Sequence, residues 1–271
     1  MRDSLPPELA GRFVRRGDDR RSALVRRDFA DAFDGLGLLG AADLAPAALV
    51  EAARRAGLEG ARLAGGASGR GTIAVLPAGR LGRAGVRPCR RGGLARRFSR
   101  RRYVWGRRAE RELLVTERLR ARGVPVIEPL AAVRSDLRPG YRAALVTLWE
   151  DEARPAAAAL HGLSAEEAAP ILRAVGRTAA RLHAAGGWHA DLHVGNLLVR
   201  EGDPAPILVD LDRGRTFPFP VPEIVGRSSL RRLERHLRKH GLSGAVAATA
   251  ALREAYALER ERIREGPPEG R

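Results

Sequence analysis

The stretch GGWHADLHVGNLLV, residues 186–199, decides the fold, because it places two histidines, an aspartate and an asparagine within eight positions between apolar segments. Three kinds of structure use such residues. One is a solvated loop with a capping aspartate, and Gly195 and Asn196 are ordinary turn residues. The second is a zinc or iron site formed by His189, Asp191 and His193. The third is the catalytic loop of a phosphotransferase.

The phosphotransfer hypothesis accounts for more of the sequence than the other two. Transfer of a phosphoryl group from ATP to a hydroxyl needs a carboxylate near the hydroxyl and oxygen ligands for magnesium. Asp191 is a candidate for the first role, and Asn196, five residues later, has the protein-kinase spacing of a magnesium ligand. The alternating histidines, by contrast, match none of the common metal-binding spacings.

A second acidic motif follows at the expected place. PILVDLDRGR, residues 206–215, is an apolar run that ends in Asp210, fourteen residues after Asn196. A magnesium-chelating aspartate at the end of a strand is expected there. Asp210 is the preferred candidate and Asp212 the substitute. Two motifs in this order are more specific than either alone.

The candidate phosphate loop lies upstream, in GGASGRGTIAVLPAG, residues 65–79. Glycine allows backbone N–H groups to approach an anion closely, so Gly69, Arg70 and Gly71 are candidate ATP-binding residues. A plain connection into a strand at residues 72–76 explains the same glycines.

A kinase-type lysine is missing, because Lys239 is the chain's one lysine and lies beyond both motifs. Arg87, at the end of a possible short strand, is the candidate cation, and Glu112 on the next helix is its candidate partner. Arg90 and Arg91 are alternatives to Arg87. Pro88 removes a backbone donor and predicts an edge strand or a bulge.

Periodicity and turn residues predict the remaining elements. Ser164 and Glu167 have the spacing of a helix capping box. Leu230, Leu233 and Leu237 share one helix face, which we expect to pack in the core rather than on lipid. We expect helices at 22–33, 46–58, 105–122, 165–185 and, as a pair, 223–264, and strand hairpins at 125–133 with 141–150 and at 197–199 with 206–209.

These elements predict an α+β protein of two lobes, strand-rich and helix-rich, with ATP in the cleft between them. We expect an N-terminal helical extension at 1–60, a strand-rich lobe at 61–150, a helical lobe at 151–265 and a disordered tail at 266–271.

Composition is less informative. The 271 residues carry 49 basic and 32 acidic side chains, a net charge of +17 that attracts polyanions of any kind. The single cysteine, Cys89, excludes an internal disulfide and an all-cysteine metal site. Arginine interrupts the apolar runs, and the first residues lack an apolar signal segment, so we expect a cytoplasmic protein.

The chain resembles the lipopolysaccharide sugar kinases, and among them the 3-deoxy-D-manno-octulosonic acid (Kdo) kinases. The resemblance spans residues 65–239 and is carried by GRGT at 69–72, RRGGLARRFSRRRYVW at 90–105, ERELLVTERLRARGVPVIEPLAA at 110–132, HADLHVGN and VDLDRGR.

The resemblance implies a protein-kinase-like fold and transfer of the ATP γ-phosphate to a sugar hydroxyl of Kdo-lipid A or a related inner-core acceptor. By position it implies that Asp191 is the catalytic base, Asn196 and Asp210 are magnesium ligands, Arg87 is the phosphate-side cation and Glu112 its partner. It also implies a place on the cytoplasmic face of the inner membrane, where arginines contact the anionic surface, and no nucleic-acid partner.

Two alternatives stay open. The loop HADLHVGN also resembles those of aminoglycoside phosphotransferases and quinone-biosynthesis kinase-like proteins, and a heptose kinase is a further alternative. A basic, non-catalytic nucleic-acid-binding pseudokinase would account for the charge and the missing lysine, although the chain has few aromatic residues for base stacking.

Overall fold

The computed structural model describes residues 6–41, 43–65, 71–89, 107–137, 140–203 and 205–266. The chain forms two compact units. Their described residues are 6–41, 43–65, 71–89, 107–117, 128–137 and 140–150 in the sheet unit, and 118–127, 151–203 and 205–266 in the helical unit.

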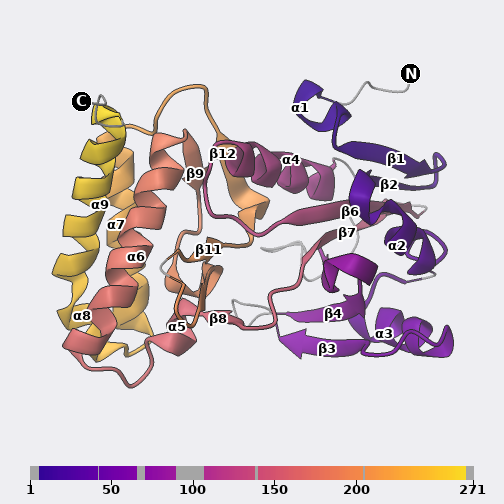
Figure 1. The fold of residues 1–271 in the computed structure, drawn as a ribbon, viewed down its shortest axis with the longest axis horizontal. Coiled ribbons are helices and arrows are strands. Elements are labelled where there is room, and N and C mark those ends of the chain that lie inside the picture. Colours follow the sequence, from indigo (N-terminus) through magenta and orange to yellow (C-terminus); the bar gives the residue numbers. More distant parts are fainter. Residues whose placement is uncertain are drawn as a thin grey trace. The chain divides into compact units, whose positions relative to one another are not determined.

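The sheet unit is built on a seven-stranded antiparallel sheet of order β1-β2-β6-β7-β5-β4-β3 (Figure 1). Its strands are β1 (Phe13–Gly17), β2 (Arg21–Arg26), β3 (Arg62–Gly65), β4 (Thr72–Pro77), β5 (Arg83–Pro88), β6 (Pro129–Asp136) and β7 (Tyr141–Leu148). Its helices are α1 (Pro7–Ala10), α2 (Ala30–Gly35), α3 (Pro46–Arg55) and α4 (Arg108–Ala121), of which the last turn belongs to the helical unit.

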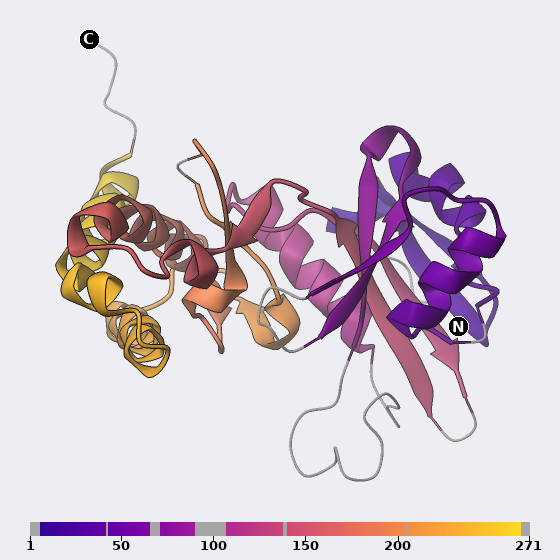
Figure 2. The same ribbon diagram turned by 90° about the horizontal axis from the view of Figure 1, so that it is seen from below.

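The alternation of side chains along the strands gives this sheet two apolar faces. Ala131 and Val133 of β6 pack with α2 and α3, whereas Ala132 between them packs with Ala109 and Leu113 of α4. Figure 2 shows α2 and α3 on one face of the sheet and α4 on the other. The sheet is therefore a buried layer, which holds β5 and α4 in a fixed relation.

The N-terminal segment is where the sequence-based prediction is wrong. We expected a helical extension at 1–60 with a helix from residue 22, but Arg21–Arg26 is strand β2, which pairs with both β1 and β6. Of the helix expected at 22–33, only the 3-10 turn Arg27–Phe29 and α2 are helical, whereas the helix expected at 46–58 is present as α3. The apolar run Ala23–Val25 is buried on both faces of a central strand, and such a run carries no period that separates strand from helix.

Pro88 also differs from expectation, because β5 lies inside the sheet between β7 and β4 rather than at an edge. The β4 ladder reaches only Val86, so at Pro88 the strand pairs with Ala144 of β7 alone. The missing N–H of proline therefore falls where one side of the ladder has already ended.

The helical unit consists mainly of α6 and α9, which pack side by side (Figure 1), and of α7. Its elements are β8 (Ala153–Pro155), α5 (Ala156–Ala159), α6 (Ala165–Ala184), β9 (Gly187–His189), β10 (Leu197–Arg200), β11 (Ile207–Leu208), β12 (Gly214–Thr216), α7 (Glu223–Lys239), α8 (Ser243–Ala247) and α9 (Thr249–Glu265). The strands form two small sheets, β11-β10-β8 and β12-β9.

Several predictions for this unit are confirmed. Ser164 and Glu167 form the capping box of α6, with Ser164 N donating to Glu167 Oε2 at 2.8 Å. β10 and β11 form the expected hairpin, and β6 and β7 form the one expected in the sheet unit. The leucines of α7 are buried, so that face is core and not lipid-facing. Among the described residues no helix is long and apolar enough to cross a bilayer.

Candidate catalytic site

The motif at 186–199 begins where α6 ends. Gly186 has a positive φ of 73°, and a Cβ on it would lie 2.4 Å from the carbonyl oxygen of Phe217. Glycine is thus required by both the turn and the close approach of backbone. The turn leads into β9, which pairs with β12, so the two acidic motifs enter the site on neighbouring strands.

Asn196 joins the two motifs. Its side-chain Nδ2 donates to the carbonyl oxygen of Asp191 at 3.0 Å, and its own carbonyl oxygen accepts from Val209 N, also at 3.0 Å. The residue is 1% exposed, and its Oδ1 has no hydrogen-bond partner among the described residues. A buried acceptor without a donor is costly, which indicates that this oxygen serves a ligand.

Asp210 follows directly on Val209 and has φ 61° and ψ 54°. Among the described residues it is the one non-glycine with a positive φ. A left-handed conformation costs an L-residue about 1 to 2 kcal/mol, and such strain gathers at functional sites. The bond from Val209 to Asn196 thus places the strained, half-buried Asp210 beside the loop of Asp191. Asp212 lies two residues on, in the 3-10 turn Leu211–Arg213.

His189 also connects the two motifs, because its ring contacts the backbone of both Asp191 and Val209. Its Nδ1 accepts from Asp191 N at 3.2 Å, so Nε2 carries the proton and faces the carbonyl oxygen of Val209 at 3.3 Å. Burial lowers the pKa of His189, which keeps the ring neutral. Both ring nitrogens are thus occupied by backbone, and His189 orients the loop rather than binding a metal.

His193 lies against the candidate base. Its Nδ1 accepts from Gly195 N at 3.0 Å, and its Nε2 lies 3.7 Å from Asp191 Oδ2. The ring is buried, whereas the side chain of Asp191 is 56% exposed. Asp191 is therefore accessible to a substrate while its neighbour is fixed.

Helix α7 supports this loop through contacts that the sequence analysis missed. The rings of His193 and His236 stack at 4.2 Å, and His236 stacks on His240 at 4.1 Å. Arg232 donates to the carbonyl oxygen of Ala190. Burial, then the neighbouring histidines, lower the pKa of His236 to about 4. The spacing of 236 and 240 by one helical turn was the available signal.

The donors fit magnesium better than zinc. Within the described part of the chain no three His, Cys, Asp or Glu side chains gather around a point that could hold a metal. The side chains that the two motifs supply, the amide oxygen of Asn196 and the carboxylates of Asp191 and Asp210, are hard oxygen donors of the kind magnesium prefers. The alternative of a zinc or iron site at His189, Asp191 and His193 thus has no support.

In the sheet unit, Arg87 of β5 and Glu112 of α4 form an ion pair between Arg87 Nη2 and Glu112 Oε1. Glu112 is 1% exposed, and the Arg87 side chain is 30% exposed. Gly71 lies just before β4. The other upstream candidates, Gly69, Arg70, Arg90 and Arg91, lie outside the described residues.

The sequence profile of the lipopolysaccharide kinase (Kdo/WaaP) family matches residues 58–256. A 3-deoxy-D-manno-octulosonic acid kinase of Xanthomonas euvesicatoria is 39% identical over 164 residues, 59% of this chain and 63% of that protein. The matched part thus spans less than two thirds of that relative. One of Xylella fastidiosa is 34% identical over 199 residues, 71% of this chain and 75% of that protein.

The solved structure of WaaP in complex with acyl carrier protein superposes with a TM-score of 0.42 at 18% identity, covering 78% of this chain and 91% of that one. The family profile matches well over half of the chain, and it takes in both acidic motifs and the ion pair of the sheet unit. This protein therefore belongs to the lipopolysaccharide kinase (Kdo/WaaP) family.

Proposed function

We propose that the protein is an ATP-dependent kinase that phosphorylates a hydroxyl of Kdo in the lipopolysaccharide inner core. Membership of the lipopolysaccharide kinase family and the Kdo kinase activity of the Xanthomonas and Xylella relatives support a sugar kinase. The observation that carries the proposal is a pair of hydrogen bonds made by Asn196. Its side-chain Nδ2 donates to the carbonyl oxygen of Asp191, and its backbone carbonyl oxygen accepts from Val209 N, next to Asp210.

In this reaction Asp191 is the catalytic base. Its exposed carboxylate accepts the proton of the sugar hydroxyl as that oxygen bonds to the γ-phosphorus of ATP, while the bond from phosphorus to the β,γ-bridging oxygen breaks and ADP leaves. His193 and Asn196 hold the loop on either side, so the base meets the hydroxyl in one orientation.

Asn196 and Asp210 would hold magnesium, with Asn196 Oδ1 as the amide ligand that lacks a partner among the described residues. The ion, when bound, neutralises charge on the phosphates. Asp210 is favoured over Asp212 because its backbone is the strained position next to Val209, which bonds to Asn196.

We assign the phosphate-side cation to Arg87, with Glu112 as the residue that orients it. Arginine keeps the charge of the usual lysine and can bind a phosphate with two parallel bonds. Gly69, Arg70 and Gly71 are proposed as the loop over the ATP phosphates.

The proposed acceptor is Kdo-lipid A, which sits in a membrane. The enzyme would therefore act as a peripheral protein on the cytoplasmic face of the inner membrane and needs no nucleic acid. The basic surface, with a net charge of +17, supports contact with anionic lipid.

A phosphoryl-transfer assay tests the proposal. Purified protein with [γ-32P]ATP, magnesium and Kdo-lipid A should give labelled lipid. Asp191→Ala should lower kcat by roughly 100- to 10,000-fold with ATP affinity almost unchanged, because a general base is lost and the nucleotide contacts are not. Asp210→Ala should weaken binding of the magnesium nucleotide.

Asp212→Ala is the matched control, because it removes an equal charge two residues from Asp210. It should retain activity. Label on a heptosylated acceptor but not on Kdo-lipid A would move the proposal to a heptose kinase. Normal rates in Asp191→Ala would refute the assignment of the base.

A further inference from the structure

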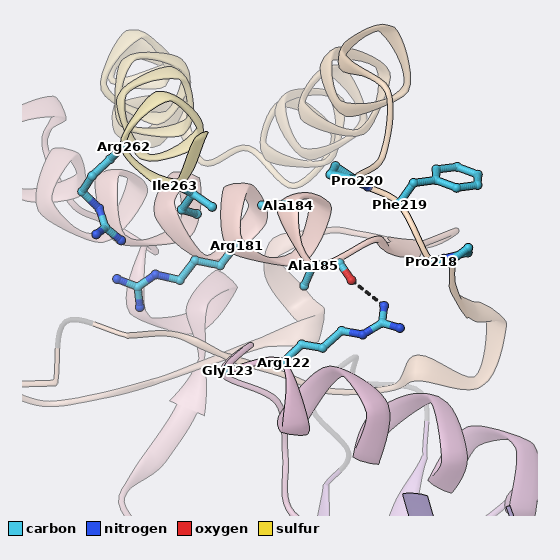
Figure 3. Close-up of a pocket in the computed structure, with 10 residues that line it drawn as sticks. All are labelled: Arg122, Gly123, Arg181, Ala184, Ala185, Pro218, Phe219, Pro220, Arg262 and Ile263. Carbon is cyan, nitrogen blue, oxygen red and sulfur yellow. Dashed lines mark hydrogen bonds between the residues drawn. The ribbon is translucent and has the colours of Figure 1, made fainter. Parts of the chain in front are cut away.

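A hollow of about 560 Å³ lies in the helical unit (Figure 3). Its wall comes from the end of α4, the end of α6, the end of α9 and the segment between β12 and α7. Three of the lining residues are arginines, Arg122, Arg181 and Arg262, and no lining residue is acidic. The volume is in the range of small-molecule sites.

The segment Phe217–Val221 that forms one rim is firmly held. Phe217 N donates to Gly186 O at 2.9 Å, and Val221 N donates to His183 O at 2.8 Å. Arg122 Nη1 donates to the carbonyl oxygens of Phe217 and Ala185, at 2.9 and 2.7 Å. The conformation of the segment Phe217–Val221 is therefore fixed by backbone hydrogen bonds at both of its ends.

This fixed segment nevertheless exposes an aromatic ring. Phe219 lies between Pro218 and Pro220, is 56% exposed, and stacks on Phe217. Ile263 of α9, on the opposite rim, is 37% exposed, and Ile224 at the start of α7 is 79% exposed. Apolar side chains that line one hollow and are rimmed by polar residues, as Phe219 and Ile263 are by the arginines, are typical of an interaction surface.

The arginines give the hollow a positive charge. Arg181 and Arg262 share the carboxylate of Glu259, at 2.7 and 2.8 Å. The bonds from Arg262 and Arg181 lower the pKa of Glu259 to about 2, so it stays ionised. One carboxylate thus balances one of these two cations, and Arg122 donates to two neutral carbonyl oxygens. The hollow is complementary to a phosphate beside an apolar surface.

We propose that this hollow, bordered by Arg122, Arg181, Arg262, Phe219 and Ile263, docks the protein on a membrane by binding the phosphate of an anionic lipid headgroup. The exposed Phe219 and Ile263 enter the interface between headgroups and acyl chains, as aromatic and aliphatic side chains do in peripheral proteins. The inference deepens the proposed function, which places the acceptor in a membrane, but it stands on contacts that the reaction does not use.

Vesicle flotation tests it with full-length protein, without ATP or sugar. The protein should bind vesicles of phosphatidylcholine mixed with phosphatidylglycerol and not vesicles of phosphatidylcholine alone. Arg262→Gln should weaken binding about fivefold, the effect of one cation at an anionic surface. Phe219→Ala should weaken binding by a similar factor. Both side chains are exposed, so neither change threatens the fold.

Two controls remove an equal group elsewhere. Arg264→Gln takes one charge from the same helix, where Arg264 is 77% exposed and pairs with Glu261 outside the hollow, and should leave binding unchanged. Leu63→Ala removes an exposed apolar side chain from the sheet unit and should also have no effect. Equal losses in Arg262→Gln and Arg264→Gln would show attraction by overall charge and overturn the proposal, as would normal binding by Phe219→Ala.

Two further measurements separate lipid from free phosphate and docking from catalysis. Inorganic phosphate that binds in calorimetry without any binding to vesicles overturns the lipid proposal. Asp191→Ala should bind vesicles like the unmodified protein. If the unmodified protein phosphorylates a lipid-free Kdo acceptor but does not bind vesicles, docking alone is refuted. If it binds vesicles but transfers no phosphoryl group, the proposed function alone is refuted.

Discussion

Asn196 performs two tasks with one amide. Its Nδ2 donates to the carbonyl oxygen of Asp191, while its Oδ1 is buried and has no hydrogen-bond partner among the described residues. Only Oδ1 is proposed to bind magnesium. An aspartate at this position would keep an oxygen ligand but lose the donor. The two atoms can therefore be tested separately.

We expect Asn196→Ala to lower kcat on the order of 100-fold and to raise the magnesium concentration needed for half-maximal rate. Asn196→Asp should restore part of the metal response but not the full rate, because the bond to Asp191 O is lost. Rate against magnesium concentration measures both effects. The ligand assignment fails if the alanine variant shows the same magnesium requirement as the unmodified protein.

His193 is expected to position Asp191 rather than to bind substrate. His193→Asn keeps an acceptor for Gly195 N but removes the ring that stacks on His236 and faces Asp191. It should lower kcat about tenfold with KM for ATP unchanged, as loss of a supporting contact does. His240→Gln, at the far end of the stack, is the control and should keep the rate. A change in KM alone would contradict a positioning role.

Spacing along one loop and one hairpin selects Asp191, Asn196 and Asp210 from the sequence, and their roles stay a prediction. The sequence was insufficient for His236 and Arg232, which reach the loop from a helix about forty residues on. Such contacts depend on how helices pack, and the spacing within one helix does not state its partner.

Among the elements, α6 carries the clearest local signal. Ser164 accepts from Glu167 N and Glu167 accepts from Ser164 N. Ser164→Ala should lower the free energy of unfolding of the helical unit by about 1 kcal/mol. Ser243→Ala is the control, because Ser243 begins α8 without a side-chain cap bond and should cost little. Urea denaturation measures both, and equal effects would mean that the capping box is not stabilising.

The contact between α6 and α9 gives a pH dependence. His183 Nδ1 and Tyr256 OH lie 2.9 Å apart, and burial, with Arg260 second, lowers the pKa of His183 from 6.5 to about 4. Between these values the unfolded chain binds a proton that the folded chain excludes. Its contribution to stability is therefore complete above pH 6.5 and is lost as the pH falls towards 4.

We expect the unfolding free energy to fall by about 2 kcal/mol from this group near pH 5. His183→Phe keeps a ring of similar size but cannot titrate, so its unfolding free energy should be lower at neutral pH and should depend less on pH. Denaturation at a series of pH values measures the slope. An unchanged slope would show that His183 is not a source of the dependence.

Local signals also explain which elements were predictable. The period of α6 is visible in the sequence because exposed and buried positions alternate along the helix, and the hairpin of β6 and β7 is marked by the turn residues between its strands. Strand β2 was read as part of a helix because Leu24 packs against one face of the sheet and Val25 against the other, so the alternation is lost.

At the scale of the whole molecule, the excess of basic residues, 49 against 32, favours no single partner, because it attracts any polyanion. This attraction has a signature different from that of the proposed docking site. Binding of a labelled single-stranded RNA should weaken steeply and linearly in the logarithm of salt concentration, as counterion release requires. It should be the same for Arg262→Gln and Arg264→Gln, since each removes one charge from a surplus of 17.

Fluorescence anisotropy at increasing sodium chloride measures this binding. The comparison of RNA binding with vesicle binding is informative, because Arg262→Gln and Arg264→Gln should differ in vesicle binding but not in RNA binding. RNA binding that persists at high salt, or that separates the two variants, would indicate a built nucleic-acid site and would favour a nucleic-acid-binding role over the kinase. RNA binding that is salt-sensitive and equal in Arg262→Gln and Arg264→Gln would show that the positive charge attracts polyanions in general. The specificity for lipid phosphate would then come from the hollow.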